Sequence, residues 1–377
     1  MDFGKQALEK YKETKGNIEL SLKEALDSVD KLSTFYTPGV GAVSKQLSEH
    51  PEEARDYTWL GNSVAVVSDG SAVLGLGDIG PLGGLPVMTG KSMLFKHFAG
   101  INAVPIVLDV HTADEIVAAV KAIAPSFGGI NLEDIAAPKC FEIEDRLKAE
   151  LNMPVMHDDQ HGTAVVVLAA LINASKLTER ELSDCKIVVV GSGAAGTAII
   201  KLLHLYAKPS ILAVDSKGIL SRDRQDLNAE KTKLLEFTNQ DSAQGTLADA
   251  MKGADIFIGV STAGLVTGEM IKSMSGDPII IAMANPVPEI MPDEAKKAGA
   301  AIVATGRSDF QNQVNNSLAF PGIFRGALDN KVNKITDQHK IAAAEAIAAL
   351  VDNPSPENIV PSALDQRLVP AIAKVIT

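Results

Sequence analysis

Cysteine is almost absent from the sequence, with only Cys140 and Cys185 among 377 residues. Neither lies in a CxxC or CxxH pattern, so the sequence offers no zinc motif and no disulfide framework. A chain of this length buries enough surface to fold without such cross-links. We expect both cysteines to be small buried apolar residues of a protein that works in the reducing cytoplasm.

Long hydrophobic runs and an excess of positive charge are also missing. No apolar stretch reaches the roughly 18–20 residues that a membrane span requires, and the charged start of the chain lacks the apolar core of a signal peptide. The formal net charge is -12, which repels phosphate backbones. We therefore expect neither a membrane nor a nucleic acid as partner, and any anionic substrate needs a local pocket of positive charge.

Apolar, β-branched runs that alternate with helical patterns are what the sequence does contain. Their near-continuous hydrophobicity is typical of parallel strands covered on both faces, and the alternation indicates the α/β class. Between the strands we predict helices, one of them capped by Thr112 and Glu115. The predicted strands lie within 63–70, 103–110, 153–159, 186–193, 210–216, 255–261, 278–286 and 300–306.

A domain boundary is expected near residue 160. The segment 161–177 has the composition of a long buried helix that leads into a second domain. We predict an N-terminal α/β substrate and catalytic domain in residues 1–160. A Rossmann-type, doubly wound dinucleotide-binding domain follows in residues 161–377 and ends in a helical tail from about residue 336.

The strongest motif is GSGAAG, which places three glycines in GxGxxG spacing between a predicted strand and a predicted helix. In this context the first glycine makes a tight turn, the second lets the backbone approach a pyrophosphate, and the third allows helix and strand to pack closely. The amide groups of the helix N-terminus then face the anion. We predict a dinucleotide site formed by Gly191, Ser192, Gly193, Ala194, Ala195 and Gly196.

Asp215 ends the next predicted strand, about 20 residues after this motif, where an acidic residue is characteristic of the fingerprint. An acidic side chain there accepts a hydrogen bond from the ribose 2′-hydroxyl and repels a 2′-phosphate. The sequence therefore favours NAD as the cofactor, although the nearby Lys217 and Arg222 leave NADP open.

A second GxGxxG pattern occurs at Gly75, Gly77 and Gly80. Pro81 and two more glycines follow it, so we predict that no long helix opens at the third glycine. We interpret this segment as a glycine loop that shapes the floor of an active site, rather than as a second dinucleotide site.

Two pairs of adjacent acidic residues, Glu133–Asp134 and Asp158–Asp159, follow apolar segments, the second at a strand end just before a helix. Carboxylates at strand ends project into the crevice where α/β proteins bind ligands. Two carboxylates from one loop and one from another form a hard oxygen cage, which suits Mg²⁺ or Mn²⁺. We expect the flanking His157 and His161 to support the site or the helix start rather than to bind zinc.

Lys91 lies within an apolar, helix-like segment, where a lysine is unusual. Burial and a nearby metal cation would both lower its pKa and give a neutral amine that acts as a base. Lys96, on the same segment, is expected to reach solvent. Tyr36 stands beside a tight turn formed by Pro38 and Gly39, which would hold the phenol in a cleft; the alternative is an ordinary packed aromatic side chain.

Taken together, these segments resemble the malic enzymes, specifically the short bacterial and archaeal type. The resemblance covers most of the chain between about residues 35 and 330, in order. The matching stretches are FYTPGV (35–40), SDGSAVLGLGDIGPLGGLPVMTGK (68–91), SFGGINLEDIAAPKCF (126–141), PVMHDDQHGTAVV (154–166), GSGAAG (191–196), VDSKGIL (214–220), ANPVPEI (284–290) and ATGRSDFQNQVNNSLAFPGIFRGAL (304–328).

The resemblance implies the oxidative decarboxylation of malate to pyruvate and CO₂, with NAD or NADP as hydride acceptor and Mg²⁺ or Mn²⁺ as the metal. Lys91 matches the general base, Tyr36 the general acid, and Asp158 a supporting carboxylate. The metal ligands and the amides that contact substrate or nicotinamide ribose also have matching positions: Glu133, Asp134 and Asp159 for the metal, and Asn285, Asn315 and Asn316 for the amides.

One position departs from the larger members of the family. They carry an arginine in the SDG loop that holds a substrate carboxylate, whereas this chain has Ser71 and Ala72 there. The resemblance also implies a homodimer or a higher assembly, and it leaves open whether Tyr36 serves its own subunit or a neighbour. Two other functions stay open at this stage: a metal-dependent oxaloacetate decarboxylase of the same family, and a catalytically silent dinucleotide sensor.

Overall fold

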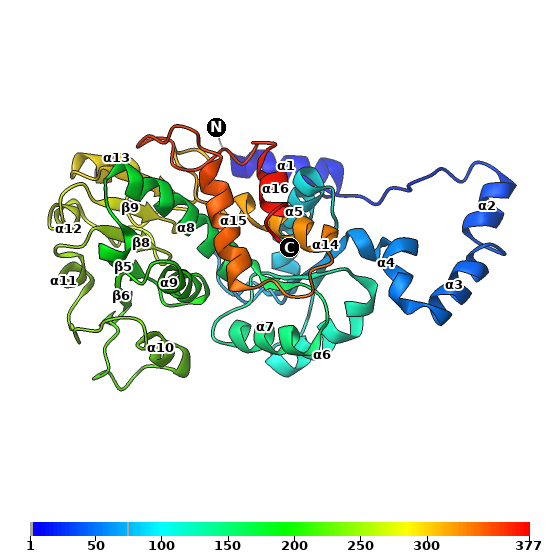
Figure 1. The fold of residues 1–377 in the computed structure, drawn as a ribbon, viewed down its shortest axis with the longest axis horizontal. Helices are drawn as coiled ribbons and strands as arrows, with labels where there is room; N and C mark the ends of the chain where they lie inside the picture. Colours follow the sequence, from blue (N-terminus) through cyan, green and yellow to red (C-terminus); the bar gives the residue numbers. More distant parts are fainter. Residues whose placement is uncertain (1–2, 74) are drawn as a thin grey trace.

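Two β-sheets organise the computed structural model, which describes residues 3–73 and 75–377 (Figure 1). One sheet lies in each half of the chain, and buried apolar residues pack on both faces of each sheet. The structure therefore has the α/β class that the sequence predicts.

The first sheet has four parallel strands in the order β2-β1-β3-β4. Its half of the chain contains β1 (Ser63–Ser68), α5 (Gly80–Ala99), β2 (Asn102–Val107), α6 (Ala113–Ile123), β3 (Ile130–Leu132), α7 (Lys139–Glu150) and β4 (Val155–His157). Along β1, Val64 and Val66 join the core that includes α5, whereas Ala65 and Val67 join the core that includes α6 and α7. The strand reads as one hydrophobic run because both of its faces are buried.

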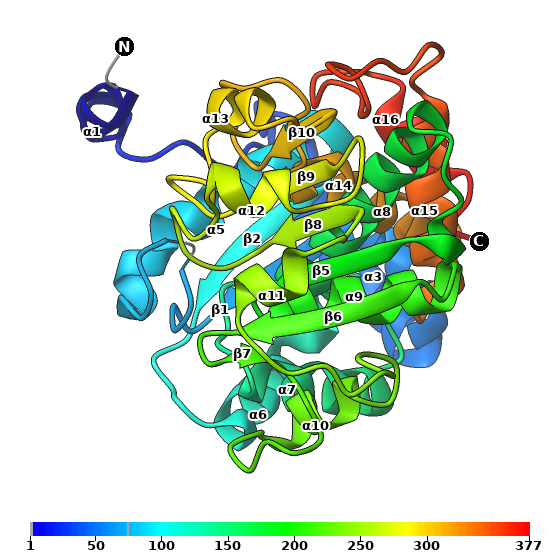
Figure 2. The same ribbon diagram turned by 90° about the vertical axis from the view of Figure 1, so that its left-hand side faces the viewer.

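The second sheet has six strands in the order β10-β9-β8-β5-β6-β7, and all but the short β7 are parallel (Figure 2). Its elements are β5 (Lys186–Val190), α9 (Ala194–Tyr206), β6 (Ser210–Asp215), β7 (Gly218–Ile219), α10 (Ala229–Leu234), α11 (Leu247–Met251), β8 (Ile256–Gly259), α12 (Gly268–Lys272), β9 (Ile279–Ala282), α13 (Pro292–Lys297) and β10 (Ile302–Thr305). The strand order reverses beside β5, which opens a crevice for ligands at the carboxyl edge of the sheet.

Four further helices connect the two halves: α8 (Asp158–Leu177), α14 (Phe320–Asp329), α15 (Asp337–Ala349) and α16 (Leu368–Ala373). Helix α8 is buried along most of its length and shares one core with residues of both sheets. The boundary expected near residue 160 falls at the start of this helix and remains a prediction.

Phe95 joins the first half of the chain to α14. It is fully buried, and its ring packs edge-on against Phe320 and Phe324, with ring centroids 4.7 and 5.4 Å apart. We expect Phe95→Ala to lower the free energy of unfolding by about 3–5 kcal/mol, because the surrounding helices cannot close the cavity. Urea denaturation would measure the loss. The exposed Phe3 of α1 is the matched control, since Phe3→Ala should cost under about 0.5 kcal/mol; equal losses would contradict the prediction.

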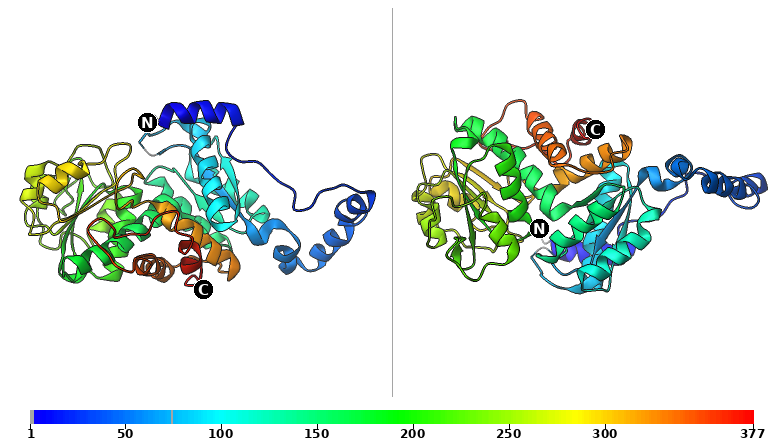
Figure 3. Two further views of the ribbon diagram at one scale, coloured as in Figure 1. Left: turned by 90° about the horizontal axis from the view of Figure 1, so that it is seen from above. Right: turned by 60° about the horizontal axis from the view of Figure 1, so that its bottom comes forward.

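The N-terminal helices are α1 (Phe3–Thr14), α2 (Val29–Phe35), α3 (Val40–Glu49) and α4 (Ala54–Tyr57). Residues 18–49, which we call the arm, extend far from both sheets and carry α2 and α3 at their outer end (Figures 1 and 3). No residue of α1, α2 or α3 is buried.

The predicted strands are confirmed at all eight positions, while β3 and β7 were not predicted. Thr112 caps α6 in a capping box with Glu115, as predicted. Cys140 and Cys185 are free and buried, also as predicted. Among the described residues, no helix combines the length and the apolar character that crossing a bilayer requires.

Two local predictions were wrong. Helix α5 begins at Gly80, where no long helix was expected; Pro81 fits in the first turn because the N–H group it lacks needs no helical partner there. Helix α8 begins at Asp158, so the acidic pair lies inside its first turn rather than before it. Carboxylates are favoured there by the positive end of the helix dipole.

Candidate active site

Four carboxylates meet at the carboxyl edge of the first sheet. Glu133 and Asp134 follow β3, and Asp158 and Asp159 follow the parallel neighbour β4, so both pairs emerge at the same edge. The Asp134 amide donates a 2.8 Å hydrogen bond to Asp159 Oδ2, which ties the two loops together. Glu133, Asp134 and Asp159 each offer one oxygen, and these oxygens lie within 4.8 Å of one another.

This cluster fits a hard divalent cation. Glu133, Asp134 and Asp158 are buried, and burial together with the neighbouring carboxylates raises the pKa of Glu133 well above its ordinary value. A cation stabilises carboxylates that are crowded and buried in this way. A donor set made only of carboxylate oxygens suits Mg²⁺ or Mn²⁺, so the residues fit the metal that the sequence predicts.

The two histidines beside the acidic pair lie outside this donor set. His157 is fully buried, and its Nδ1 lies 3.9 Å from Asp159 Oδ2. His161 Nε2 instead lies 2.8 Å from Glu144 Oε2 on α7. Glu144 also accepts a 3.0 Å hydrogen bond from the His157 amide. The buried Glu144, which the sequence did not single out, therefore fixes the start of α8 and with it the acidic pair.

Lys91 is buried in α5 with its amine directed at the acidic cluster. Its Nζ lies 2.8 Å from Glu133 Oε1, is in contact with Asp158 Oδ2 and lies 3.3 Å from Asn316 Oδ1. The amine also lies 4.4 Å from the centroid of the Phe320 ring, which is a cation–π contact. Residues that are far apart in sequence thus converge on one amine.

The charge on Lys91 depends on the groups that face its amine. Burial by itself lowers the pKa of Lys91, but the carboxylates of Asp158, Glu133 and Asp159 outweigh burial and raise the pKa above its ordinary value. The sequence-based prediction of a neutral amine depends on a bound metal cation that offsets these carboxylates, so it stays a prediction. Lys96 is exposed, as predicted.

The GSGAAG segment connects β5 to α9, as predicted for a dinucleotide loop. Gly191 has φ +102°, and a Cβ there would lie 2.5 Å from the backbone of the loop after β8. A Cβ at Gly196 would lie 1.7 Å from the Gly191 carbonyl, whereas no atom lies within 4 Å of the Cβ position at Gly193. No side chain of the described residues caps α9, so the amides of Ala194 and Ala195 can face a pyrophosphate at the open glycine.

Asp215 lies at the end of β6, as predicted, but it is not alone. Arg224 binds both of its oxygens at 2.8 and 3.0 Å, and Lys231 Nζ lies 2.6 Å from Oδ2. Partial burial would raise the pKa of Asp215, but the hydrogen bonds from Arg224 and Lys231 lower it to about 2. Arg222, which the sequence suggested as the neighbouring cation, instead donates to the Leu235 carbonyl at 2.9 Å.

The predicted asparagines occupy different places. Asn316 contacts Lys91, whereas Asn315 caps the short 3₁₀ helix Asn316–Leu318 through a 2.9 Å hydrogen bond from a backbone amide. Asn285 is exposed in the loop after β9. A Cβ at Gly75 would lie 2.6 Å from the Asn285 carbonyl, so the second glycine motif packs directly against this loop of the other sheet.

Glu289 is a buried carboxylate that sequence reasoning missed. It accepts hydrogen bonds from the amides of Ser261 at 2.9 Å and Ala284 at 3.0 Å, which joins the loops after β8 and β9 at the carboxyl edge. Burial raises the pKa of Glu289 above its ordinary value. The sequence could have indicated Glu289 as a buried carboxylate, because it stands among apolar residues in the segment ANPVPEI.

Tyr36 is the one predicted catalytic residue that the fold does not bring to the cluster. It follows α2 on the arm, and 65 % of its surface is exposed. Helix α2 lies at the far end of the arm, whereas α5, which carries Lys91, packs on the first sheet (Figures 1 and 3). Within one chain the phenol and the amine therefore do not form one site.

Comparison with known proteins identifies related sequences across both halves of the chain. The family model for the malic enzyme N-terminal domain matches residues 15–148, and that for the malic enzyme NAD binding domain matches residues 160–375. The chain is 53% identical to a bifunctional malic/malolactic enzyme of Bacillus subtilis over 379 residues, which covers 100% of this chain and 92% of the relative. It is 51% identical to an NAD-dependent malic enzyme of Geobacillus stearothermophilus, covering 96% and 76%.

A solved structure agrees with these sequence matches. The crystal structure of an NAD-dependent malic enzyme from Thermotoga maritima has a TM-score of 0.95 and 51% sequence identity, and the match covers 98% of each chain. Since both family models and the relatives extend over nearly all of the sequence, the chain belongs to the malic enzyme family.

Proposed function

We propose that this protein oxidises and decarboxylates malate to pyruvate and CO₂ while reducing NAD, with Mg²⁺ or Mn²⁺ as an essential ion. The observation that carries the proposal is the buried Lys91 amine, which is held within hydrogen-bonding distance of a cluster of carboxylates that fits a divalent cation. The names of the related enzymes suggest malate as the substrate. The glycine loop between β5 and α9 supports a dinucleotide as the cofactor.

In this proposal Lys91 Nζ takes the proton of the malate C2 hydroxyl. A nicotinamide dinucleotide held by the loop between β5 and α9 would supply the hydride acceptor for C2, and a divalent cation held by Glu133, Asp134 and Asp159 would supply positive charge for the substrate oxygen as CO₂ leaves. Asp158 Oδ2 and Asn316 Oδ1 position the amine before the reaction. Lys91 must be neutral to accept this proton, and a cation held by the neighbouring carboxylates would favour the neutral amine by offsetting their charge. The Tyr36 hydroxyl then delivers a proton to C3, which gives pyruvate.

Initial rates of malate oxidation with NAD and with NADP, with and without a chelator, test the reaction. We expect NADH formation that stops with the chelator and returns with Mg²⁺ or Mn²⁺. Oxaloacetate consumption without any malate-dependent NADH would indicate a decarboxylase that lacks the redox half-reaction. Absence of both activities in the metal-loaded protein would favour a dinucleotide sensor.

A substitution in the acidic cluster should change the metal requirement. We expect Asp134→Asn to raise the Mg²⁺ concentration for half-maximal rate about tenfold or more, because one anionic ligand is lost. Glu52→Gln is the matched control, since Glu52 belongs to an exposed acidic group on the surface. Equal metal titrations for Asp134→Asn and the unaltered protein would remove Asp134 from the proposed ligands.

We further propose that the arm packs against a second copy of the chain. Its outward side chains include Leu20, Val29, Phe35 and Tyr36, which are 87%, 77%, 56% and 65% exposed. Large apolar side chains that are exposed together on one segment indicate an interaction site. A two-fold assembly would make the contact reciprocal and would bring Tyr36 of each arm to the Lys91 cluster of the other subunit.

Mixing two inactive variants tests this exchange. If the site is shared, Tyr36→Phe and Lys91→Ala subunits that are dissociated and reassembled together should recover about a quarter of the original activity, because half of the random dimers contain one intact site. Each variant reassembled alone is the control. If each arm serves its own subunit, both sites of every mixed dimer carry a defect and no activity returns. Mixed dimers that form but stay inactive would therefore contradict the proposal.

A further inference from the structure

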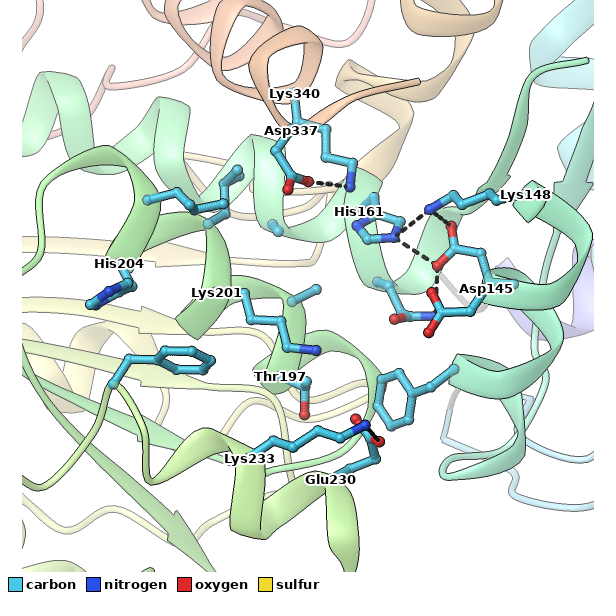
Figure 4. A pocket seen from close by; sticks show the side chains of 18 residues that line it. Asp145, Lys148, His161, Thr197, Lys201, His204, Glu230, Lys233, Asp337 and Lys340 are labelled. Atoms are coloured by element: carbon cyan, nitrogen blue, oxygen red, sulfur yellow. Dashed lines mark hydrogen bonds and ion pairs between the residues drawn. The ribbon is translucent and has the colours of Figure 1, made fainter. Parts of the chain in front are cut away.

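A cavity of about 380 Å³ lies between α7, the first two turns of α8, α9, α10 and α15 (Figure 4). Its walls come from both halves of the chain. The acidic cluster, Lys91 and the GSGAAG segment do not contribute to its lining. Neither malate nor the dinucleotide therefore accounts for this space.

Four lysines line the cavity, and three of them are already neutralised. Their ion pairs are Lys148–Glu144 at 2.6 Å, Lys233–Glu230 at 2.6 Å and Lys340–Asp337 at 2.8 Å. Lys201 on α9 forms no ion pair or hydrogen bond with any described residue, and its Nζ lies 5.9 Å from the centroid of the Phe141 ring. Figure 4 shows its amine directed into the cavity. Lys201 therefore supplies positive charge that the protein does not itself use.

Thr197 provides a second unused group on the same wall. It lies one helical turn before Lys201, so both side chains project from one face of α9. Only 2% of Thr197 is exposed, and among the described residues its Oγ1 has no hydrogen-bond partner. A buried hydroxyl without a partner is costly, and this one lines the cavity. An acceptor oxygen beside it would satisfy the hydroxyl.

The carboxylates around the cavity do not fill this role. Glu144 is bound by Lys148 and His161, and Glu230 and Asp337 hold their own lysines. The remaining acidic residue, Asp145, is exposed. A free amine beside a free donor forms a local site for an anion from solution, which the net charge of -12 would otherwise repel.

We propose that this cavity binds a small metabolite through an oxyanion group, a phosphate or a carboxylate, held by Lys201 Nζ and Thr197 Oγ1. The volume leaves room for a body larger than the oxyanion, beside the Phe141 ring. Because α7 and α9 belong to different halves of the chain, the occupant would bridge them. The site is separate from the one proposed for malate and does not depend on that function.

Calorimetric titration tests the site directly. Inorganic phosphate and succinate are the probes, each added to the full chain with saturating NAD so that the pyrophosphate loop does not compete. We expect saturable binding of at least one probe, and which of them binds identifies the oxyanion class. Lys201→Met should weaken that binding about tenfold or more, and Thr197→Val about threefold to tenfold, because each loses a hydrogen bond to a charged group.

Two controls keep the result interpretable. Lys374→Met removes an exposed lysine directly after α16 that is not part of the cavity, and it should leave binding unchanged. Thr197→Val removes an unpaired hydroxyl at similar volume, so its Tm should not fall and the variant should remain folded. No saturable binding of either probe would overturn the proposal, as would binding that is equally strong in the Lys201→Met and Thr197→Val proteins.

Discussion

Replacement of Lys91 by alanine is expected to lower malate-dependent NADH formation by about a thousandfold or more, while NAD binding stays intact. The C2 hydroxyl must lose its proton before hydride can leave, and among the described residues Lys91 supplies the one amine that contacts both Glu133 and Asp158. The dinucleotide loop lies in the second sheet and contains no part of this amine's network, so the affinity for NAD should not change. Steady-state rates and calorimetry with NAD measure the two effects separately.

Lys96→Ala is the matched control for this experiment. It lies on the same helix, is exposed, and its amine contacts only Asn102 at 2.9 Å, so the rate should stay within about twofold of the original. A third measurement separates the base from a structural effect. Decarboxylation of added oxaloacetate needs no hydroxyl deprotonation, so Lys91→Ala should lose much less of that activity. A parallel loss of both activities would show that the variant has lost its site, and near-normal malate oxidation would refute the proposed role.

Most strands were predictable because a parallel strand covered on both faces reads as one apolar run. The exceptions are β3, which is short and follows two glycines, and β7, which has two residues. The start of α5 was mispredicted because glycine and proline dominate its first turns, and those residues break isolated helices. In the fold, Gly84 and Met88 of α5 are buried, so tertiary packing overrides local preference.

The sequence predicted which residues belong to the candidate site, but it did not predict which of their side chains contact one another. Carboxylate pairs at strand ends and a lysine in an apolar helix are local signals, and the structure brings them together. The pairing of Lys91 with Asn316 spans 225 positions, and no local pattern reports such a contact. The charge state of Lys91 cannot be read from local sequence either, because it depends on how many carboxylates and cations face the amine. Tyr36 could be predicted as a residue type, but within one chain the fold does not bring it to the acidic cluster and Lys91.

The second large effect is expected at Asp215, whose substitution should convert an NAD site into one that accepts NADP. In the structure the carboxylate holds Arg224 and Lys231 at the end of β6, where the adenosine ribose of a dinucleotide is bound in this fold. Asp215→Ser would remove the charge that repels a 2′-phosphate and would leave beside it Lys231 and Arg224, of which Arg224 stays bound to Asp226. We expect the ratio of kcat/KM for NADP to that for NAD to rise about a thousandfold, since each charge-assisted contact contributes about 1.5–3 kcal/mol.

Two further variants decide whether the released cations cause this change. Asp223→Ser removes the same charge nearby, but Asp223 Oδ2 accepts only from Gln244, so the cofactor ratio should stay within about threefold of the original. Arg224→Ala added to Asp215→Ser should reverse most of the increase in the NADP to NAD ratio, because the guanidinium that would bind the 2′-phosphate is removed. If the double variant keeps the full preference for NADP, loss of repulsion alone explains the switch. An unchanged ratio in Asp215→Ser would place the ribose elsewhere. If the ratio rises as expected and falls again in the double variant, Arg224 and Lys231 form a phosphate site that Asp215 keeps closed.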